Sequence, residues 1–359
     1  MPPKKSTLEH FFKAPPSKRT RNAASPSSPS TTTKSSTDSL VPSSHPTYQF
    51  AIPQLPNSIT ESLEHAIPSL DNGKRVDDQP HLDLVHFHRY LPRGIEASIF
   101  DFLRENLFFY RVQYAKKFGN KEMQINTPRY TTVFGVDESS FFNAQPGSDS
   151  GPNVCVECMG TGACNHGVDT RTTQVIFDSK SKCPVPKDRY SCRPRPIPDG
   201  LMFLKKMTEA STAQTYNFCL VNYYADGNDS ISYHSDDERF LGANPAIASF
   251  SLGTNRDFLM KHKPDKKKPA KTENVLKDKP LKLTLDSGDM LLMRGAKKAK
   301  WLHSIPKRKG GESGNGRINI TFRKAMVPGG TENYYKYNVG EGGTFKWSRK
   351  DKNMIPWTS

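Results

Sequence analysis

The sequence lacks any long apolar segment. No run of 18 apolar residues occurs among its 359 residues, and the N-terminal stretch MPPKKSTLEH has no apolar core like that of a secretory signal. We therefore expect a chain that neither spans a membrane nor is secreted. Cysteine is also scarce: six residues are too few for a disulfide framework in a chain of this length, and a reducing compartment fits best.

Hydrophobic residues are few, and basic residues are in excess. The hydrophobic share of 34% predicts that part of the chain does not fold. The formal net charge of +16 favours a polyanionic partner, with nucleic acid as the first candidate. A soluble basic protein without such a partner is the alternative.

The first 21 residues contain an apolar cluster and a basic cluster. If this segment is helical, Leu8, Phe11 and Phe12 would share one side of a single turn. Their spacing resembles the clamp-binding box of DNA replication and repair proteins, although Lys5 stands where that box has Gln. The resemblance implies the replication sliding clamp, proliferating cell nuclear antigen, as a partner; an amphipathic segment without function is the alternative. The cluster KRTR at 18–21 fits a nuclear import signal or is a chance group of charges.

The segment that follows this tail cannot form a core. Between residues 22 and 47, 18 of 26 residues are Ser, Thr or Pro. Such a composition buries too little apolar surface to offset the entropy lost on ordering. We therefore predict a disordered linker over residues 22–60.

Regular patterns begin after residue 80. Helical spacing occurs at 92–109, and strand patterns occur at 81–90, 111–118 and 124–135. In the last of these segments Arg129, Tyr130 and Phe134 combine a cation with aromatic rings, which suits gripping a phosphate and stacking on a base. Ordinary core packing is the alternative for these side chains.

An insertion over residues 137–198 holds most of the cysteines. It contains one Cys-x-x-Cys pair and two further zinc-binding residue types, in the order Cys155, Cys158, Cys164 and His166. Thiolate and imidazole ligands at this spacing suit a structural zinc site. Only one Cys-x-x-Cys pair is present, so loop cysteines without a metal are the alternative.

The pattern with the clearest chemistry is His234-x-Asp236. Side chains two positions apart on a strand lie on the same face, so an imidazole and a carboxylate would lie together. This pair supplies two thirds of the two-histidine, one-carboxylate triad that binds non-haem Fe(II) and leaves positions open. A solvated strand or turn is the alternative for the pair alone.

Further elements are expected on both sides of this pair. They are a helix at 201–209 and strands at 215–224, 230–236, 246–252, 281–285 and 289–293. Residues 261–282 contain nine Lys and three acidic residues, which indicates an exposed insertion. Beside a nucleic-acid site this insertion would add salt-sensitive affinity.

The segment RINITFR at 317–323 alternates strictly between two faces. Apolar residues occupy one face, and the other carries Arg317, Asn319, Thr321 and Arg323. Two guanidinium groups on an inner face are costly without anions, and guanidinium pairs bidentately with carboxylate. A dicarboxylate metabolite would satisfy both groups; pairing with the protein's own acids is the alternative.

Three stretches together resemble the AlkB family of Fe(II)- and 2-oxoglutarate-dependent nucleic-acid dealkylases, and most closely its eukaryotic DNA-repair members. They are NYYADGNDSISYHSDDE from Asn222, PAIASFSLGTNRDF from Pro245, and His303 followed by RINITFR. The resemblance covers roughly residues 80–328. It implies a mainly β fold with flanking helices, whose double-stranded β-helix (jelly roll) core follows the disordered N-terminal tail and precedes an extension at 329–359.

The resemblance also implies roles for individual residues. The iron ligands would be His234, Asp236 and His303. The 2-oxoglutarate contacts would be Asn222, Tyr224, Arg317, Thr321 and Arg323. Asp237 would contact the substrate base, joining Arg129, Tyr130 and Phe134 as candidate substrate contacts.

The implied reaction is oxidative dealkylation of DNA bases with Fe(II), 2-oxoglutarate and O2, and the expected location is the nucleus. 1-Methyladenine and 3-methylcytosine are the preferred substrates, because a lesion that blocks pairing makes base flipping less costly. An RNA N-methyl demethylase of the same family is the alternative enzyme. A non-catalytic adaptor at the replication fork is the alternative of another class. The clamp-binding box favours DNA, whereas the triad and both arginines favour an enzyme.

Overall fold

The structure is a computed structural model that describes residue 52 and most of residues 54–357. The gaps in that range are 66–69, 112, 119–120, 144–174, 187, 237, 243–244, 264–279, 296–299, 309–315 and 340–342. Several residues singled out in the sequence therefore lie outside the described part: Leu8, Phe11, Phe12, Cys155, Cys158, Cys164, His166 and Asp237.

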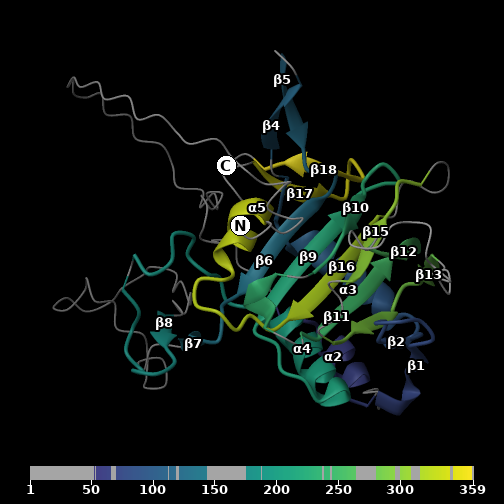
Figure 1. Cartoon of the computed structure of the whole chain (residues 1–359), viewed down its shortest axis with the longest axis horizontal. Helices are drawn as coiled ribbons and strands as arrows, with labels where there is room; N and C mark the ends of the chain where they lie inside the picture. Colours follow the sequence, from purple (N-terminus) through teal and green to yellow (C-terminus); the bar gives the residue numbers. More distant parts are fainter. Residues whose placement is uncertain are drawn as a thin grey trace, which may run out of the picture.

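A ten-stranded antiparallel sheet forms the centre of the molecule (Figure 1). Its strands, in spatial order, are β1 (Lys74–Val76), β2 (Leu84–Phe87), β14 (Met290–Met293), β11 (Ile247–Gly253), β16 (Arg317–Arg323), β9 (Phe218–Tyr224), β6 (Tyr130–Gly135), β3 (Phe109–Tyr110), β17 (Thr344–Ser348) and β18 (Asn353–Pro356). A second, four-stranded sheet has the order β10 (Ile231–His234), β15 (Trp301–Ile305), β12 (Arg256–His262) and β13 (Leu281–Leu285). The two sheets form the expected jelly roll.

Two hairpins lie apart from these sheets. Among the described strands, β4 (Gln113–Phe118) pairs with β5 (Lys121–Asn126) alone, and this hairpin projects away from the main sheet in Figure 1. β7 (Ser140–Asn143) pairs with β8 (Val175–Asp178), and this second hairpin lies to the left of the main sheet in Figure 1. The helices are α2 (Asn57–Glu64), α3 (Ile95–Asn106), α4 (Asp199–Thr212) and α5 (Glu332–Asn338). Among the helices that the structure describes, none is both long and apolar enough to span a membrane.

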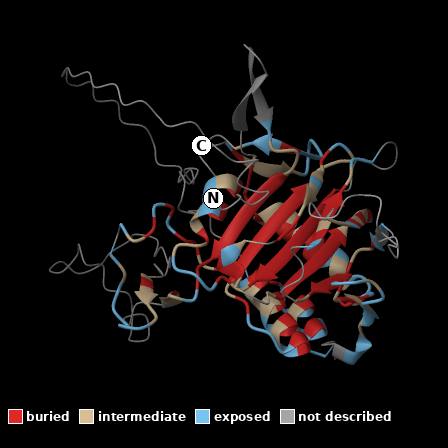
Figure 2. Ribbon diagram, in the orientation of Figure 1, coloured by how far each residue is buried: buried red, intermediate tan, exposed pale blue. Residues whose placement is uncertain are grey.

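The two faces of the large sheet pack against different layers, because successive strand residues point to opposite faces. Ile318, Ile320 and Phe322 of β16 share one apolar cluster with Ile99 and Leu103 of α3. The opposite face belongs to a second cluster, which the four-stranded sheet completes through residues such as Phe258, Met260 and Trp301. Figure 2 shows that the strands at the centre of the large sheet are buried between these layers.

The helix expected at 92–109 is present as α3. Its apolar stripe faces the core: Ile99 and Leu103 are 0% and 1% exposed, and Ile95 and Phe102 pack at the edge of the same cluster. Gly94 precedes the helix at φ +84°, a left-handed conformation that a residue with a Cβ rarely adopts. Gly94 therefore lets the chain turn directly from the loop into α3.

The structure corrects three boundaries. α2 begins at Asn57, inside the range assigned to the linker, because Ile59 and Leu63 pack into the core. β1 precedes the strand that was expected to be the first one. The strand expected at 124–135 is divided into β5 and β6, since Pro128 has no backbone N–H for a ladder and lies between them.

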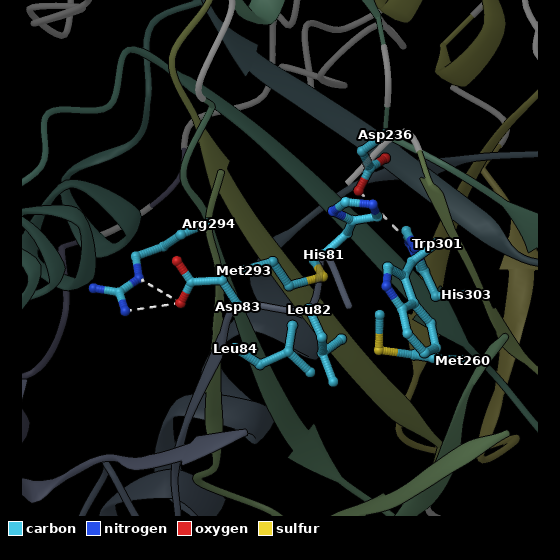
Figure 3. A pocket seen from close by; sticks show the side chains of 10 residues that line it. All are labelled: His81, Leu82, Asp83, Leu84, Asp236, Met260, Met293, Arg294, Trp301 and His303. Carbon is cyan, nitrogen blue, oxygen red and sulfur yellow. Dashed lines mark hydrogen bonds and ion pairs between the residues drawn. The ribbon is translucent and has the colours of Figure 1, made fainter. Parts of the chain in front are cut away.

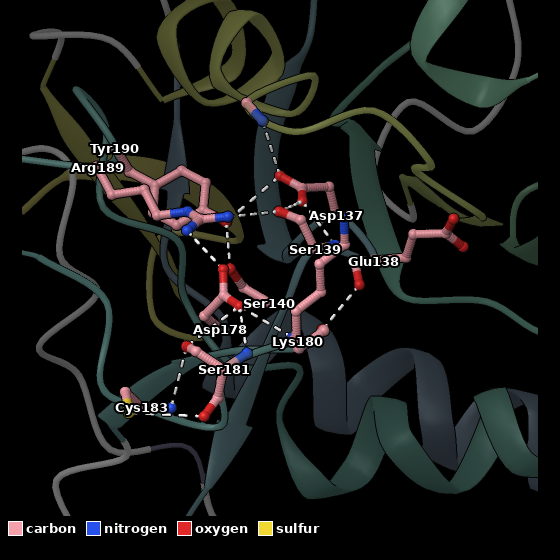
Figure 4. A network of polar contacts seen from close by, with 12 residues as sticks. Asp137, Glu138, Ser139, Ser140, Asp178, Lys180, Ser181, Cys183, Arg189 and Tyr190 are labelled. Atoms are coloured by element: carbon pink, nitrogen blue, oxygen red, sulfur yellow. Dashed lines mark hydrogen bonds and ion pairs between the residues drawn. The ribbon is translucent and has the colours of Figure 1, made fainter.

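The described flanks of the insertion at 137–198 are held by polar contacts (Figure 4). Asp178 accepts hydrogen bonds from the backbone N–H groups of Lys180 and Ser181, each over 2.9 Å. Its other carboxylate oxygen lies 2.7 Å from the Arg189 guanidinium. These bonds lower the pKa of Asp178 to about 2 and fix the turn after β8.

The segment after residue 328 is built into the fold. β17 pairs with β3 and so adds two strands, itself and β18, to one edge of the main sheet. The ring of Trp347 on β17 lies 4.3 Å from the Arg104 guanidinium of α3. α5 packs against the sheet through Tyr334 and Tyr335, which are 8% and 0% exposed. The extension is therefore continuous with the core.

Candidate functional site

The candidate site lies between the two sheets, on the inner face of β9 and β16. Antiparallel pairing of these strands places Asn222 opposite Asn319 and Tyr224 opposite Arg317. The alternation that directs Ile318 and Ile320 of β16 to the helices turns the polar residues of that strand to the other side. A polar surface is thereby formed inside an otherwise apolar interior.

Three residues proposed as metal ligands come together at the edge of the small sheet. His234 on β10 lies directly across from His303 on β15, and their ring centroids are 4.2 Å apart. His303 Nε2 is 3.5 Å from Asp236 Oδ2. One nitrogen or oxygen ligand atom from each of the three residues lies within 4.8 Å of the others. The arrangement matches a two-histidine, one-carboxylate donor set.

The local geometry of this group differs from the expectation in one respect. β10 ends at His234, so Asp236 lies beyond the strand, and the pairing with β15 is irregular between Ile231 and His234. The carboxylate reaches the imidazoles from the turn after the strand. Strand alternation is therefore not the reason that the two side chains meet.

The orientation of the His234 ring is set by a contact with the backbone of Ser232, two residues earlier. Its Nδ1 lies 2.9 Å from the carbonyl oxygen of Ser232. Because a carbonyl only accepts, Nδ1 carries the proton in this contact and Nε2 keeps its lone pair. Burial lowers the pKa of His234, although the Asp236 carboxylate opposes this effect. The neutral imidazole is the form that binds metals.

A cavity borders the triad (Figure 3). Asp236 and His303 line it together with apolar side chains, among them Met260, Met293 and Trp301. At its far side Asp83 pairs with Arg294 over 2.8 Å. Two of the three proposed ligands therefore border free space.

Arg323 is the cation paired with the triad carboxylate. Its Nη1 lies 3.2 Å from Asp236 Oδ1, and both side chains are 5% exposed. Burial lowers the pKa of Arg323, but the nearby Asp236, Tyr334 and Glu238 together outweigh burial, with Asp236 contributing most, and the pKa is raised overall. The pair orients Asp236 and balances its charge.

Arg317 is also buried, but no carboxylate among the described residues forms an ion pair with it. It is 1% exposed, and its Nη2 donates to Ser251 Oγ over 2.8 Å. Its Nε and Nη1 have no hydrogen-bond partner among the described residues. Burial lowers the pKa of Arg317 to about 10, with Arg256 adding repulsion and Tyr224 opposing both. A buried guanidinium with two nitrogens that lack hydrogen-bond partners is suited to an anionic ligand such as a carboxylate.

The remaining residues predicted to contact 2-oxoglutarate are also in this space. Asn222 is 5% exposed and its Oδ1 accepts a hydrogen bond from Arg129 Nε over 2.8 Å. The Tyr224 ring lies between two cations, 5.4 Å from Arg317 and 5.7 Å from Arg256. Thr321 Oγ1 donates to the carbonyl of Leu220 over 3.1 Å. All five predicted contacts therefore lie on one inner face.

The predicted substrate contacts are less well placed. Phe134 is 1% exposed and Tyr130 is 6% exposed, and both rings belong to the apolar cluster beneath the sheet. Their position contradicts the expectation that they stack on a base, because β6 is fully covered. Arg129 points to Asn222, and Asp237 lies outside the described residues.

The turn between β9 and β10 helps to hold the strands of His234 and His303 together. Asp226 Oδ1 accepts the N–H of Asn228 over 2.7 Å. Gly227 accepts the N–H of Arg308 over 2.8 Å, and a Cβ at Gly227 would lie 2.4 Å from the Arg308 carbonyl oxygen. Glycine is required here because the loop after β15 passes so close. This contact ties the strand of His234 to the strand of His303.

Three residues near the site had no role assigned from the sequence. Asn319 donates to Ser249 Oγ over 2.8 Å, and strict alternation already placed it on the inner face. Glu238 is partly buried; burial, followed by repulsion from Asp236, raises its pKa to about 7. Tyr334 contacts both Glu238 and Arg323. No local pattern in the sequence indicates that Tyr334, from the extension, reaches the site.

A second group of potential ligands occurs at the edge of the large sheet, consisting of His88, Asp286 and Asp289. Asp289 already accepts hydrogen bonds from the N–H groups of Arg89 and Asp286, over 2.9 and 3.1 Å. It also lies 2.9 Å from His86 Nε2. These bonds give the buried Asp289 carboxylate a structural role: it connects β2 and the residues after it to the turn before β14.

The donor set at the first group fits Fe(II), and the buried, only partly paired guanidinium of Arg317 on β16 fits a carboxylate of 2-oxoglutarate. The model of the 2OG-Fe(II) oxygenase superfamily matches residues 166–323, a range that contains the triad and both arginines. The same range contains Asn222, Tyr224 and Thr321.

Individual proteins show the same relationship. The mouse alpha-ketoglutarate-dependent dioxygenase alkB homolog 3 is 42% identical over 123 residues, which cover 34% of this chain and 41% of that protein. The match thus spans less than half of that relative's length. DNA oxidative demethylase ALKBH2 of Arabidopsis thaliana is 39% identical over 283 residues, 75% of this chain and 76% of that protein. The solved structure of OsALKBH1 aligns over 70% of this chain and 99% of its own, with 17% identity and a TM-score of 0.37.

The relationship to the Arabidopsis protein covers about three quarters of both chains. This chain belongs to the AlkB family of 2OG-Fe(II) oxygenases.

Proposed function

We propose that this protein is an Fe(II)- and 2-oxoglutarate-dependent dioxygenase that removes alkyl groups from bases in DNA. The observation that carries the proposal is Arg317, a buried guanidinium whose Nε and Nη1 have no hydrogen-bond partner among the described residues. Leaving such a cation unpaired is costly unless an anion completes the site. A dicarboxylate co-substrate beside a His-Asp-His donor set meets this requirement.

In this proposal His234, Asp236 and His303 hold the metal, and Arg317 pairs with a carboxylate of 2-oxoglutarate. Arg323 keeps Asp236 oriented through the 3.2 Å contact and compensates its charge. Asn222, Tyr224 and Thr321 border the co-substrate on the same face. When bound, iron supplies the oxidation of an N-alkyl carbon, with 2-oxoglutarate and O2 as co-substrates.

DNA is the proposed substrate. The net charge of +16 favours a polyanion, and the Arabidopsis relative is named as a DNA oxidative demethylase. An N-alkyl group on a pairing edge is out of reach within a duplex, so the base must be flipped out. Lesions that block pairing, 1-methyladenine and 3-methylcytosine, reduce the cost of flipping and are the proposed targets. Asp237, next to Asp236 in the chain, is a candidate acceptor for the amino group of the base.

The proposed setting is the nucleus, at the replication sliding clamp. Leu8, Phe11 and Phe12 form the proposed clamp-binding box, and the basic cluster at 18–21 fits nuclear import. The Ser/Thr/Pro-rich segment that follows would connect this box to the catalytic domain.

Turnover of a single defined lesion tests the proposed activity. A DNA oligonucleotide with one 1-methyladenine is incubated with the purified protein, Fe(II), 2-oxoglutarate and ascorbate. Its mass is then measured for the loss of one methyl group. We expect this loss with the wild type and no loss with Asp236→Ala. A matched RNA oligonucleotide, run in parallel, should react at least about ten times more slowly.

Each alternative predicts another result. Faster turnover of the RNA would contradict DNA as the substrate and support the RNA demethylase. Consumption of 2-oxoglutarate without loss of methyl from either oligonucleotide would retain the oxygenase and contradict the proposed lesion. No consumption with any substrate would contradict the enzyme and support a nucleic-acid-binding adaptor.

A further inference from the structure

Tyr334 reaches the candidate site from α5, which follows the last residue matched by the superfamily model. Its hydroxyl accepts a hydrogen bond from Arg323 Nη1 and donates one to Glu238 Oε1, the latter over 2.7 Å. The ring is clamped at its edges by Phe218 and Phe240, with centroids 5.3 and 5.4 Å away. Both the ring and the hydroxyl of Tyr334 are therefore fixed in place.

We propose that Tyr334 is a positioning residue for 2-oxoglutarate binding: it orients the Arg323 guanidinium and, through it, the Asp236 carboxylate. This inference rests on the proposed function, because it concerns the same co-substrate. It adds a residue from the C-terminal extension to a site whose other members lie between residues 222 and 323.

The argument starts from the flexibility of arginine. A guanidinium on a long side chain has many rotamers, and fixing one of them costs entropy when a ligand binds. Arg323 Nη1 is shared between the Tyr334 hydroxyl and Asp236 Oδ1, which lies 3.2 Å away. Two acceptors in fixed positions define the plane of the guanidinium before any ligand arrives. Arg323 Nε then remains without a partner among the described residues.

Glu238 explains why a hydroxyl is needed at this position. Asp236 and Glu238 are two acids close to a single guanidinium, and both attract it. The Tyr334 hydroxyl stands between Arg323 and Glu238, accepting from the first and donating to the second. If the hydroxyl is removed, Glu238 loses its donor and competes with Asp236 for Arg323. The expected consequence is a guanidinium that no longer rests in one orientation.

The neighbouring Tyr335 provides a matched control. It is on the same helix, is 0% exposed, and has a hydroxyl that also makes buried hydrogen bonds. That hydroxyl accepts the backbone N–H of Arg195 over 2.9 Å and donates to the carbonyl of Gly135 over 2.6 Å. These partners belong to the backbone around β6. Tyr335→Phe therefore perturbs the packing of α5 while leaving the contacts of Arg323 in place.

The test measures binding in the absence of turnover. The dissociation constant of 2-oxoglutarate is determined by isothermal titration calorimetry, with Mn(II) replacing Fe(II), for the full-length wild type, Tyr334→Phe and Tyr335→Phe. We expect Tyr334→Phe to weaken binding by about 10-fold, the scale of one hydrogen bond to a charged group. Tyr335→Phe should remain within about twofold of the wild type, although its melting temperature falls at least as much.

A double-mutant comparison tests whether Tyr334 acts through Arg323. In an Arg323→Ala background, adding Tyr334→Phe should produce no further loss of affinity. An additive loss would overturn the proposal, as would wild-type affinity in Tyr334→Phe or equal losses in both tyrosine variants. If the wild type itself does not bind 2-oxoglutarate with Mn(II), the proposed function fails and this inference fails with it.

Discussion

The Arg317 guanidinium lies over the ring of Tyr224, 5.4 Å from its centroid, and two of its nitrogens have no hydrogen-bond partner among the described residues. Arg323, at the other end of the same strand, is paired with Asp236. The two arginines therefore differ in charge compensation: a carboxylate of the protein compensates the positive charge of Arg323, whereas a ligand would have to compensate that of Arg317.

Replacing Arg317 with methionine should stabilise the ligand-free protein while abolishing co-substrate binding. Methionine has a similar length and removes an uncompensated buried charge, so we expect a gain of about 1–3 kcal/mol in the free energy of unfolding. 2-Oxoglutarate affinity, measured by calorimetry with Mn(II), should fall at least about 100-fold, because the carboxylate loses its cationic partner. A destabilised variant that still binds 2-oxoglutarate would show that Arg317 is structural.

Arg195→Met is the matched control for that experiment. Arg195 is 2% exposed, but its guanidinium donates to the Val133 carbonyl and to the hydroxyls of Thr132 and Tyr110. We expect this variant to lose about 2–4 kcal/mol in the free energy of unfolding, because several charged hydrogen bonds disappear. The opposite sign of the two stability changes, seen in urea unfolding curves, is the expected result.

Asp236→Asn should weaken metal binding at least about 100-fold, because an amide is a far poorer ligand than a carboxylate. Calorimetric titration with Mn(II) measures the change. Asp83→Asn is the control: Asp83 lines the same cavity but pairs with Arg294. Equal losses in both variants would mean that the cavity, and not the triad, determines the affinity.

Asp289 should make the stability of the fold sensitive to acid. Burial raises the pKa of Asp289, but hydrogen bonds from His86 and from the N–H groups of Arg89 and Asp286 lower it below its ordinary value. A carboxylate whose folded pKa is depressed stabilises the fold above its unfolded pKa of about 3.9. This contribution is lost as the pH falls through the folded pKa.

Comparing the wild type with Asp289→Asn across pH tests this linkage. The variant should be less stable at pH 6, and the difference in the free energy of unfolding should shrink once the pH falls below about 4. Urea unfolding at several pH values provides the measurement. A difference that stays constant down to pH 2 would show that the ionisation of Asp289 is not coupled to folding.

Replacing Phe11 and Phe12 together with alanine should abolish binding to the sliding clamp, because the proposed box then loses its two aromatic anchors. Turnover of a short methylated oligonucleotide, which requires no clamp, should not change. Calorimetric titration of the clamp with the wild type and the variant measures the first effect. Retained clamp binding in the variant would rule out this box as the contact.

The alternation of RINITFR was sufficient to predict the strand 317–323 and to place both arginines on its polar face. The alternation can be read from neighbouring residues alone, because one face of this strand is entirely apolar and the other entirely polar. The His234-x-Asp236 pattern identified two side chains that meet in the structure, although the strand ends at His234 and the turn brings Asp236 to the imidazoles. Burial was harder to predict. A strand pattern does not tell whether the Phe134 ring contacts a base or packs in the core. In the structure the ring packs in the apolar cluster, because other layers cover this face of the sheet.

The sequence by itself determined which functional groups this protein carries: the His234-x-Asp236 pair, the two guanidinium groups of RINITFR and the basic tail are all readable from neighbouring residues. The tertiary structure decided which side chains meet. His303 lies beside Asp236 because β15 pairs with β10, and Tyr334 lies beside Arg323 because the extension packs α5 against the sheet. Only the tertiary structure could show that Arg317 lacks the partner that Arg323 has, since compensation of a buried charge depends on every chain segment that surrounds it.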